Sequence, residues 1–499
     1  MDCQVVHICD CFPARIRRAL AELPETLDET YERALRGINK ANWEFAHRMF
    51  QFLSVASRPL LVKELAELLA FDFEVGSIPE FCEDWRVEDP VDAVLSTCST
   101  LLAIVDNKGS LFIQFCHFSV KEFLTSTRLA EATDIVSRYH VSMTPAHTLV
   151  AQACLGLLLH LDGNITDDGL KYYHLVDYSA KHWVDHALFE EVSGNVEDGM
   201  KQLFDPSKPH LAIYVWIYDP SAPLCERLKR NETPLPLPKP SLHYAAYLGL
   251  HTVVELLINE CSQDVCSRDS TNNATPLHLA SQNGHLKAAC KLVERGADLT
   301  VQDNYGETPL HVAMNHGRVD VALMLIERGA DLTAKDEYGK SPLHIASYKG
   351  EVDVACMLIE RGADLTVKDE IGNTPLHMAS YKGEADVARM LIERGADLTA
   401  QDKNGNTPLH LALNEGKEDV ARMLIERGAD LTVTDKNGNT PLDLALESGR
   451  VEVGRMIIKH GADLTARDKN TPLHHLASAP PGILLLQKYA GLARMLLQT

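Results

Sequence analysis

The stretch DNYGETPLHVAMNHGRVDVALMLIERG, residues 303–329, is the unit from which the C-terminal half of this 499-residue sequence is built. Its tetrapeptide Thr-Pro-Leu-His, or a close variant, begins at Thr275, Thr308, Ser341, Thr374, Thr407 and Thr440, with a constant step of 33 residues. A further copy begins at Thr471 after 31 residues, and a degenerate copy, residues 240–243, precedes the series. The sequence therefore predicts about eight tandem units.

Each unit contains the signals of two short helices. The Thr308 hydroxyl can cap a helix N-terminus, and Pro309 stands at the first helical position, where a missing N–H costs nothing. Gly317 can take the left-handed conformation that ends this helix. A second apolar stripe, residues 321–326, stops at Gly329 and predicts a second helix.

A 33-residue period with this motif resembles the ankyrin repeat. One helix pair cannot bury its apolar face alone, so the pairs are expected to stack into a mostly α-helical solenoid with an extended concave wall. Residues 402–406 (Asp-Lys-Asn-Gly-Asn) lie between two units, and Asn-Gly readily supplies the positive φ angles of a tight hairpin turn. Projecting fingers are predicted at such positions.

The histidine that recurs in the motif is predicted to be structural. We expect its imidazole to hydrogen-bond to the backbone between units rather than to bind a metal. The positions are His278, His311, His344, His377 and His410.

Candidate partner-binding residues follow from the resemblance. In ankyrin proteins, partners contact the finger tips and the residues just before the glycine that closes the first helix. Those slots hold Tyr305, Asn315, His316, Tyr338, Lys340, Tyr348, Lys349, Ile371, Tyr381, Lys382, Asn404, Asn414 and Glu415.

The middle units are rich in tyrosine, a residue type that is frequent in binding hot spots. The pairs Tyr348-Lys349 and Tyr381-Lys382 recur one unit apart, so they should form an aromatic and basic patch for an acidic peptide segment. The alternative is that duplication copied Ser-Tyr-Lys-Gly-Glu without selection for contact.

Composition and charge exclude several classes of function. The chain has 48 Lys and Arg against 70 Asp and Glu, a formal charge of −22, which would repel nucleic acids and anionic membranes. Its longest apolar run, residues 153–161, is far short of the roughly 20 residues of a membrane span. The twelve cysteines form no Cys-x-x-Cys pair, and the N-terminus shows no signal-peptide pattern. These features predict a cytoplasmic protein.

No catalytic constellation is visible. A Gly-x-Ser-x-Gly nucleophile elbow is absent, so the sequence predicts a protein without enzymatic activity, cofactor or small-molecule substrate. His182 and His186 stand one helical turn apart, a spacing that can hold a metal ion. A third ligand is not evident, and the structural interpretation is preferred.

The N-terminal half reads as irregular helices interrupted by one hairpin. Helices are predicted at residues 27–38, 43–57, 62–69, 91–98, 120–128 and 146–161, and two strands, residues 101–106 and 111–116, flank Asn107-Lys108-Gly109 as in the wing of a winged helix. DNA binding is disfavoured because the helix beside the wing has only Lys121 and Arg128 as cations.

A proline-rich joint, residues 234–240, marks a domain boundary. The predicted domains are a helical remnant (1–40), a winged-helix-like domain (41–135), a helical spacer (136–233) and the ankyrin repeats (234–499).

Four phrases in this half resemble fungal NACHT-ankyrin proteins of the NOD-like, signal-transducing ATPase class: residues 23–31, 57–60, 115–124 and 180–187. The resemblance implies a nucleotide-binding NACHT core upstream of a winged helix, a spacer and a repeat sensor. This chain is expected to begin after that core, because no Gly-x-x-x-x-Gly-Lys-Ser/Thr phosphate loop occurs. His117 matches a winged-helix histidine that touches the nucleotide phosphate in such proteins, and it is expected to do so only if a core is supplied.

Three hypotheses remain. The first is a cytosolic sensor or scaffold that binds a protein on the repeat wall. The second is a fragment of a nucleotide-regulated NACHT switch whose core lies upstream or in another chain. The third is a decayed fragment without a partner, which the uncapped C-terminal leucines Leu492, Leu496 and Leu497 keep open.

Overall fold

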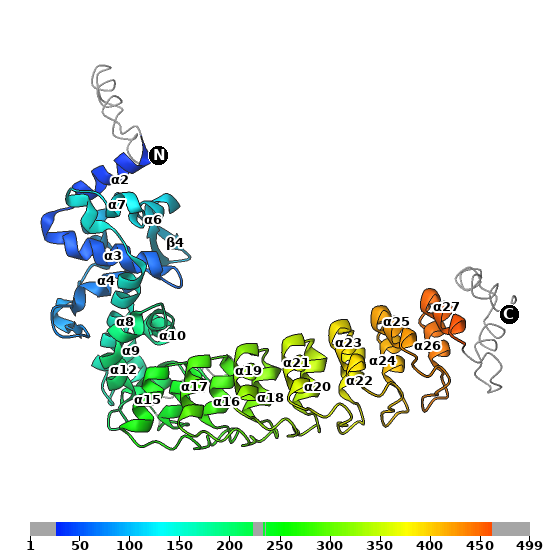
Figure 1. The fold of residues 1–499 in the computed structure, drawn as a ribbon. Coiled ribbons are helices and arrows are strands. Elements are labelled where there is room, and N and C mark those ends of the chain that lie inside the picture. The colour runs from blue at the N-terminus through cyan, green and yellow to red at the C-terminus, as the bar shows by residue number, and fades with distance from the viewer. Residues whose placement is uncertain (1–25, 223–232, 235, 462–499) are drawn as a thin grey trace, which may run out of the picture. The chain divides into compact units, whose positions relative to one another are not determined.

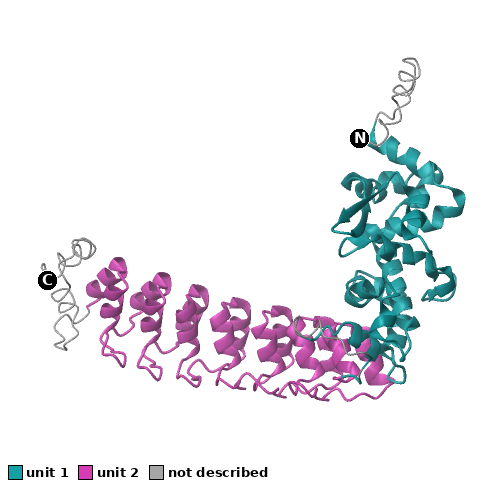
Figure 2. Ribbon diagram, turned by 180° about the vertical axis from the view of Figure 1, so that it is seen from behind, with its two compact units in different colours: residues 1–237 teal, residues 238–499 magenta. Residues whose placement is uncertain are grey.

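The computed structural model describes residues 26–222, 233, 234 and 236–461, in two compact units that divide after Leu237 (Figure 2). Each unit is described by itself. The predicted eighth repeat from Thr471 and the C-terminal leucines lie outside the described residues.

The second unit is a row of stacked helix pairs, as predicted (Figure 1). The described residues contain seven pairs: α14 (Ser241–Tyr247) with α15 (His251–Asn259), α16 (Pro276–Asn283) with α17 (Leu286–Glu294), α18 (Pro309–Asn315) with α19 (Val319–Glu327), α20 (Pro342–Lys349) with α21 (Val352–Glu360), α22 (Pro375–Lys382) with α23 (Ala385–Glu393), α24 (Pro408–Asn414) with α25 (Glu418–Glu426), and α26 (Pro441–Glu447) with α27 (Val451–Lys459). Each first helix packs on the first helix of the next pair, and the second helices do likewise.

The helix ends form as the residue types dictate. The Thr308 hydroxyl accepts a hydrogen bond from the His311 amide, and Pro309 is the first helical residue. Gly317 has φ +65° and closes the helix region. These positions confirm the predicted start and stop of α18.

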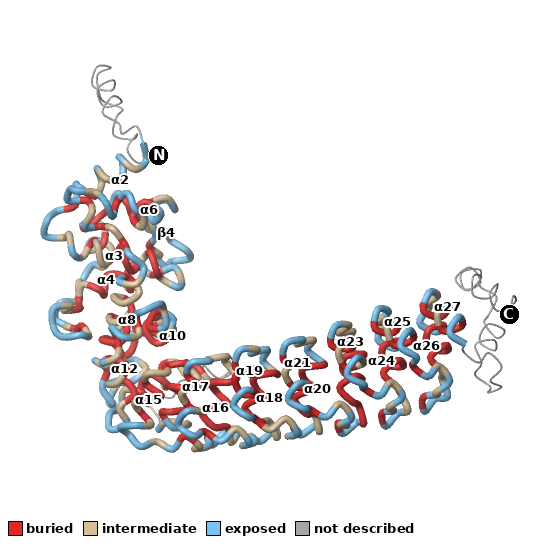
Figure 3. Tube along the Cα trace, viewed as in Figure 1, coloured by how far each residue is buried: buried red, intermediate tan, exposed pale blue. Residues whose placement is uncertain are grey.

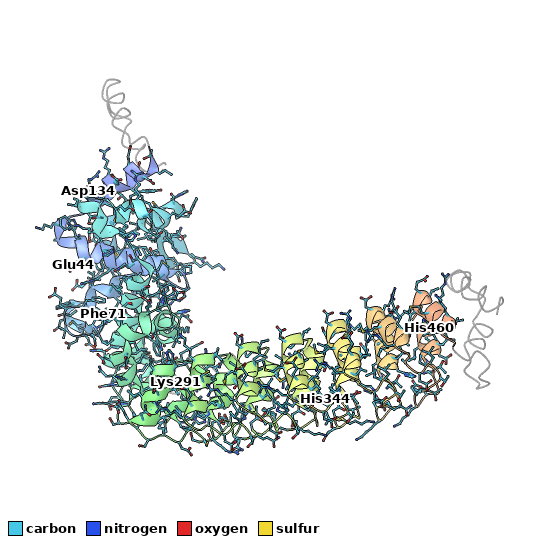
Figure 4. All side chains as sticks on the ribbon, viewed as in Figure 1. Glu44, Phe71, Asp134, Lys291, His344 and His460 are labelled. Atoms are coloured by element: carbon cyan, nitrogen blue, oxygen red, sulfur yellow. The ribbon has the colours of Figure 1, made fainter. Side chains whose placement is uncertain are left out.

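The recurring histidines join each repeat to the next, as predicted. His344 of α20, labelled in Figure 4, shows the pattern. The Ser341 amide and hydroxyl donate to His344 Nδ1 at 3.1 and 2.8 Å, while His344 Nε2 donates to the Asn373 carbonyl of the next repeat at 2.9 Å. The inter-repeat bond from Nε2 recurs at His278, His311, His377 and His410, at 3.0, 3.1, 3.0 and 3.3 Å. Buried polar groups require such partners, so these rings fix the register of the stack.

The fingers form a backbone ladder of their own. The Glu337 amide donates to Tyr305 O at 2.9 Å, and the Glu370 amide donates to Tyr338 O at 2.9 Å. Gly339 has φ +72°, and a Cβ there would come within 2.9 Å of the Glu370 nitrogen, so glycine is required by close approach as well as by conformation. The predicted Asn-Gly turn differs in one respect: of residues 404 and 405 only Gly405 has positive φ. Asp402 Oδ1 accepts from the amides of Asn404 and Asn406 and holds the turn instead.

Leucine and alanine fill the space between the stacked helices. Leu376 and Ala379 of α22 and Leu409 and Ala412 of α24 are fully buried. Figure 3 shows buried residues along the facing helices and exposed residues at many loops. The small alanines let successive helices approach closely.

The first unit begins with a small helical domain that carries the predicted wing. Strands β4 (Leu102–Asn107) and β5 (Ser110–Phe115) pair antiparallel, and β1 (Leu60–Leu61) adds to β5, giving the order β1-β5-β4. The turn residues Lys108 and Gly109 both have positive φ, as a two-residue hairpin requires. The surrounding helices are α2 (Leu27–Arg36), α3 (Trp43–Val55), α4 (Val62–Ala66), α5 (Pro90–Cys98), α6 (Phe118–Leu124) and α7 (Thr127–Ala130), with 3₁₀ helices η1 (Lys40–Asn42), η2 (Glu67–Ala70), η3 (Glu83–Trp85) and η4 (Ile135–Tyr139).

Two predictions for this region were wrong. A second strand pair, β2 (Phe71–Asp72) with β3 (Glu80–Phe81), forms a sheet separate from the wing, so the helices are interrupted by more than one strand pair. The predicted helix 120–128 is two helices, because Ser126 caps α7 by accepting from the Leu129 amide, which ends α6 before it.

The rest of the first unit packs around α8 (Met143–His160), whose residues 153–158 are buried. Its neighbours include α3, α10 (Val176–Ala187) and α12 (Glu197–Phe204). The other helices of this region are α9 (Asp167–Leu170), α11 (Val192–Asn195) and α13 (His210–Ile217). Within the described part of the chain, no helix has the length and apolar character needed to cross a membrane.

Candidate protein-binding surface

Two tyrosines at equivalent positions lie side by side at the ends of successive first helices. Tyr348 of α20 and Tyr381 of α22 have ring centroids 6.4 Å apart and ring planes within 14° of parallel. The 33-residue step produces this arrangement because α20 and α22 pack against each other. Both side chains remain over one third exposed, at 36% and 39%.

Lysine ammonium groups lie over these rings. Lys382 Nζ is 4.4 Å from the centroid of Tyr348 and 5.9 Å from that of Tyr381. Lys340 Nζ lies 5.3 Å from the finger-tip ring of Tyr338 and 6.0 Å from Tyr348. Each such contact at an exposed site contributes roughly 0.5–1 kcal/mol. We call these five residues, Tyr338, Lys340, Tyr348, Tyr381 and Lys382, the tyrosine patch.

Hydrogen bonds favour the protonated forms of two groups of the patch. The bond between Lys382 and the Tyr348 hydroxyl raises the pKa of the Lys382 ammonium above its usual value. The Tyr338 hydroxyl donates to Glu337, which raises the pKa of that tyrosine. Lys382 is therefore a cation and Tyr338 a neutral phenol at neutral pH.

The other predicted contact residues are distributed around the patch. Tyr305 and Ile371 are exposed finger-tip residues, and Lys349 is exposed at the end of α20. Exposed residues of the next repeat are Asn404, Asn414 and Glu415. The structure brings none of these six into a ring contact of the kind that joins the patch.

Two predicted contact residues are held by their own repeat. Asn315 is half-buried and its amide donates to the Glu307 carboxylate. His316 is exposed, and its Nδ1 donates to the Val312 carbonyl at 2.9 Å. A partner would therefore compete with an intramolecular bond at both positions.

Sequence reasoning missed the charged finger residues next to the predicted tips. Glu337, Glu370, Lys403 and Lys436 are all exposed and occupy one slot of the repeat, directly after the finger aspartate. The signal was available in the sequence, since this slot changes sign once along the repeats, between Glu370 and Lys403.

In the first unit, His117 caps α6. Its Nδ1 accepts from the Ser119 amide at 3.3 Å and from the Ser119 hydroxyl at 2.6 Å, and its ring lies 4.2 Å from that of Phe118. The ring itself is exposed. This gives the histidine a structural role, and contact with a nucleotide stays a prediction.

His182 and His186 have different partners. His182 Nδ1 contacts Asp185 at 3.2 Å, whereas His186 is fully buried between His147 and the Tyr178 hydroxyl, at 2.8 and 2.9 Å. Burial lowers the pKa of His186 to about 4. No group of three or more His, Cys, Asp or Glu placed to hold a metal ion was found among the described residues.

Comparison with known proteins agrees with this architecture. A family model for ankyrin repeats in three copies matches five overlapping stretches between residues 221 and 468, and a model described as the GPI inositol-deacylase winged helix domain matches residues 31–135. A Monascus ruber protein described as azaphilone pigments biosynthesis cluster protein L is 27% identical over 294 residues, which is 56% of this chain. The match covers 61% of that relative, so the chain spans less than two thirds of its length. This chain combines ankyrin repeats with an N-terminal winged helix domain similar to that of GPI inositol-deacylase.

Proposed function

We propose that this chain is a non-enzymatic, cytoplasmic sensor or scaffold that binds a protein on the concave surface of its ankyrin repeats, with an acidic segment of the partner seated on the tyrosine patch. The ankyrin repeats support a protein-interaction module in general. The observation that carries the specific proposal is the pair of parallel, exposed tyrosines with lysine ammonium groups over their faces. The helical unit would serve as a link to effector machinery.

The chemistry of the patch supports an acidic occupant. Tyr348 and Tyr381 supply rigid apolar area with polar tips, the character of interface hot spots that contribute roughly 2 kcal/mol or more each. Lys340 and Lys382 supply positive charge on a chain whose formal charge is −22. An acidic side chain beside an apolar one would meet both features.

The compartment is proposed on the state of the cysteines. At least seven of the eight cysteines that the described residues include are free thiols. A free thiol at an exposed position such as Cys116 suits a reducing compartment.

The proposal is tested by cross-linked affinity purification of the full chain with quantitative mass spectrometry. Tyr348→Ala with Tyr381→Ala should reduce recovery of specific partners by at least about tenfold, which corresponds to roughly 1.4 kcal/mol. The matched control is Leu286→Ala with Val352→Ala, because these outer-helix side chains have similar exposure, 38% and 37%. Equal recovery by both double variants would reject the patch as the binding site.

A second candidate function is a part of a nucleotide-regulated NACHT switch. The match of residues 31–135 to a winged helix model is consistent with it. Sequencing the transcript upstream of Met1 discriminates the two. An in-frame Gly-x-x-x-x-Gly-Lys-Ser/Thr loop would favour the switch, whereas in-frame stop codons would favour the sensor or scaffold.

A further inference from the structure

Charged residues around the tyrosine patch are arranged in two rows that change sign together. The finger row consists of Glu337, Glu370, Lys403 and Lys436, one per repeat. The helix-end row consists of Lys349, Lys382, Glu415 and Glu447, which close the first helices α20, α22, α24 and α26. Glu447 stands one residue earlier in its repeat than the other three. Along both rows the sign reverses between the repeat of α22 and that of α24.

These charges are available to a partner. Seven of the eight side chains are exposed, and Lys382 is half-buried because it lies on Tyr348. Within the described residues none of the eight forms an ion pair, whereas ion pairs do link other charges of successive repeats, such as Arg427 with Glu393. The two rows therefore keep their charge for an external contact.

The rows are close neighbours. Lys340 Nζ reaches the Tyr338 ring, next to Glu337, and also the Tyr348 ring, next to Lys349. Charges of the next repeat also lie at these helix ends: Glu384 lies over Gly350, beside Lys349, and Lys417 lies over Gly383, beside Lys382. Arg450 lies over Gly416, next to Glu415, and is paired with Glu418 at 3.1 Å rather than with Glu415 or Glu447.

From this arrangement we infer that the repeats select a partner by the order of its charged residues. The partner is an extended segment with an acidic and apolar block over the tyrosines and a basic block over Glu415 and Glu447. The inference rests on the proposed function and extends it by two repeats. The finger row has the opposite order of charges. A segment displaced from the helix-end row to the finger row would place its acidic block against Glu337 and Glu370, and like-charge repulsion would disfavour that placement. Such repulsion against a wrong placement is a source of specificity.

The spacing of the two blocks follows from the repeat geometry. Equivalent rings are 6.4 Å apart at the patch, and packed helix axes are about 8–10 Å apart. An extended chain rises about 3.3 Å per residue. The basic block should therefore begin about two to six residues from the acidic block.

The test is selection of a displayed random 16-residue peptide library on the full chain. Peptides enriched on the wild-type chain should carry Trp, Phe or Leu within the acidic block. The order-swapped variant, Lys349→Glu, Lys382→Glu, Glu415→Lys and Glu447→Lys, keeps the net charge, and its peptides should carry the apolar residue within the basic block. The apolar anchor reveals the order even when a peptide binds in the reverse direction.

A second variant isolates the new part of the site. Glu415→Gln with Glu447→Gln should select peptides that keep the acidic and apolar block and lose the basic block. Its control, Glu327→Gln with Glu426→Gln, removes two exposed charges from the outer helices and should keep both blocks. A synthetic peptide with its blocks exchanged should bind the wild-type chain about tenfold more weakly, because exposed ion pairs contribute roughly 0.2–1 kcal/mol each.

The outcomes separate the two proposals. In one outcome, the wild-type chain and the order-swapped variant enrich the same motif while their thermal melts match. That result would overturn selection by charge order but would not contradict the proposed binding surface. Absence of any peptide enriched over a selection on Tyr348→Ala with Tyr381→Ala would overturn both.

Discussion

Mild acid should unfold the repeats, because their buried histidines are held in the neutral form. The rings concerned are His278, His311, His344, His377 and His410, all of which are buried. In each, Nδ1 accepts a hydrogen bond from its repeat while Nε2 donates to the next, so a proton on Nδ1 would face an N–H group. Desolvation by burial lowers the pKa of all five below the usual 6.5.

The sign and size of the effect follow from linkage. The folded pKa lies below the unfolded value, so the unfolded chain binds protons first as the pH falls. The stabilisation is fully present above pH 6.5 and is lost as the pH falls from 6.5 toward the folded pKa. Each histidine costs at most about 1.4 kcal/mol per pH unit, and the slope reaches that limit only where the unfolded ring is fully protonated and the folded ring is still neutral. Because the unfolded ring is only half protonated at pH 6.5, five histidines that titrate together would remove at most about 5 kcal/mol between pH 6.5 and 5.5.

The assay is urea unfolding of the full chain at pH 7.5, 6.5 and 5.5, followed by circular dichroism. Most carboxylates stay ionised in this range, so the histidines dominate the slope. His344→Gln should lower the free energy of unfolding at pH 7.5 and reduce the slope below pH 6.5 by up to about 1.4 kcal/mol per pH unit. A free energy of unfolding that stays constant from pH 7.5 to 5.5, or an unchanged slope in His344→Gln, would refute the reasoning.

Three substitutions probe other contacts, each measured as the change in free energy of unfolding in urea. Gly339→Ala should cost about 1 kcal/mol more than Gly438→Ala, because both have positive φ but only the Cβ at 339 meets neighbouring backbone; equal costs would contradict this. Leu376→Ala removes a fully buried side chain and should cost about 3 kcal/mol, and a cost below about 1 kcal/mol would show that the helix stack collapses around the cavity. Tyr178→Phe should cost about 1–2 kcal/mol through loss of the bonds from its hydroxyl to His186 and from the Ser57 amide, and a neutral result would show that water replaces them.

The repeat array could be predicted because its signals are local and recur. The cap at Thr308, the proline after it and the glycine at 317 act within one helix, and repetition at a fixed step removes ambiguity about their meaning. The break between α6 and α7 was not predictable in the same way, because Ser126 competes with the helix through a side-chain bond that hydrophobic periodicity does not report. The strand pair β2–β3 was missed for a related reason, since two-residue strands carry no periodicity.

For the binding surface, the sequence predicted which repeat positions face a partner but not which of their side chains contact one another. Spacing alone placed Tyr348 beside Tyr381. It could not show that Lys340 reaches across from a finger, that Asn315 is bonded to Glu307, or that Arg450 is paired with Glu418, because these depend on side-chain directions between repeats.

The sequence by itself determined the helix pairs, their 33-residue spacing and their order. Short-range caps and apolar stripes encode each unit independently of the others. Only the tertiary structure decided which side chains contact one another across repeats, such as Lys340 and Lys382 with Tyr348. Stacking brings residues 33 positions apart into contact, and at that range a charge's neighbours are set by packing rather than by the chain.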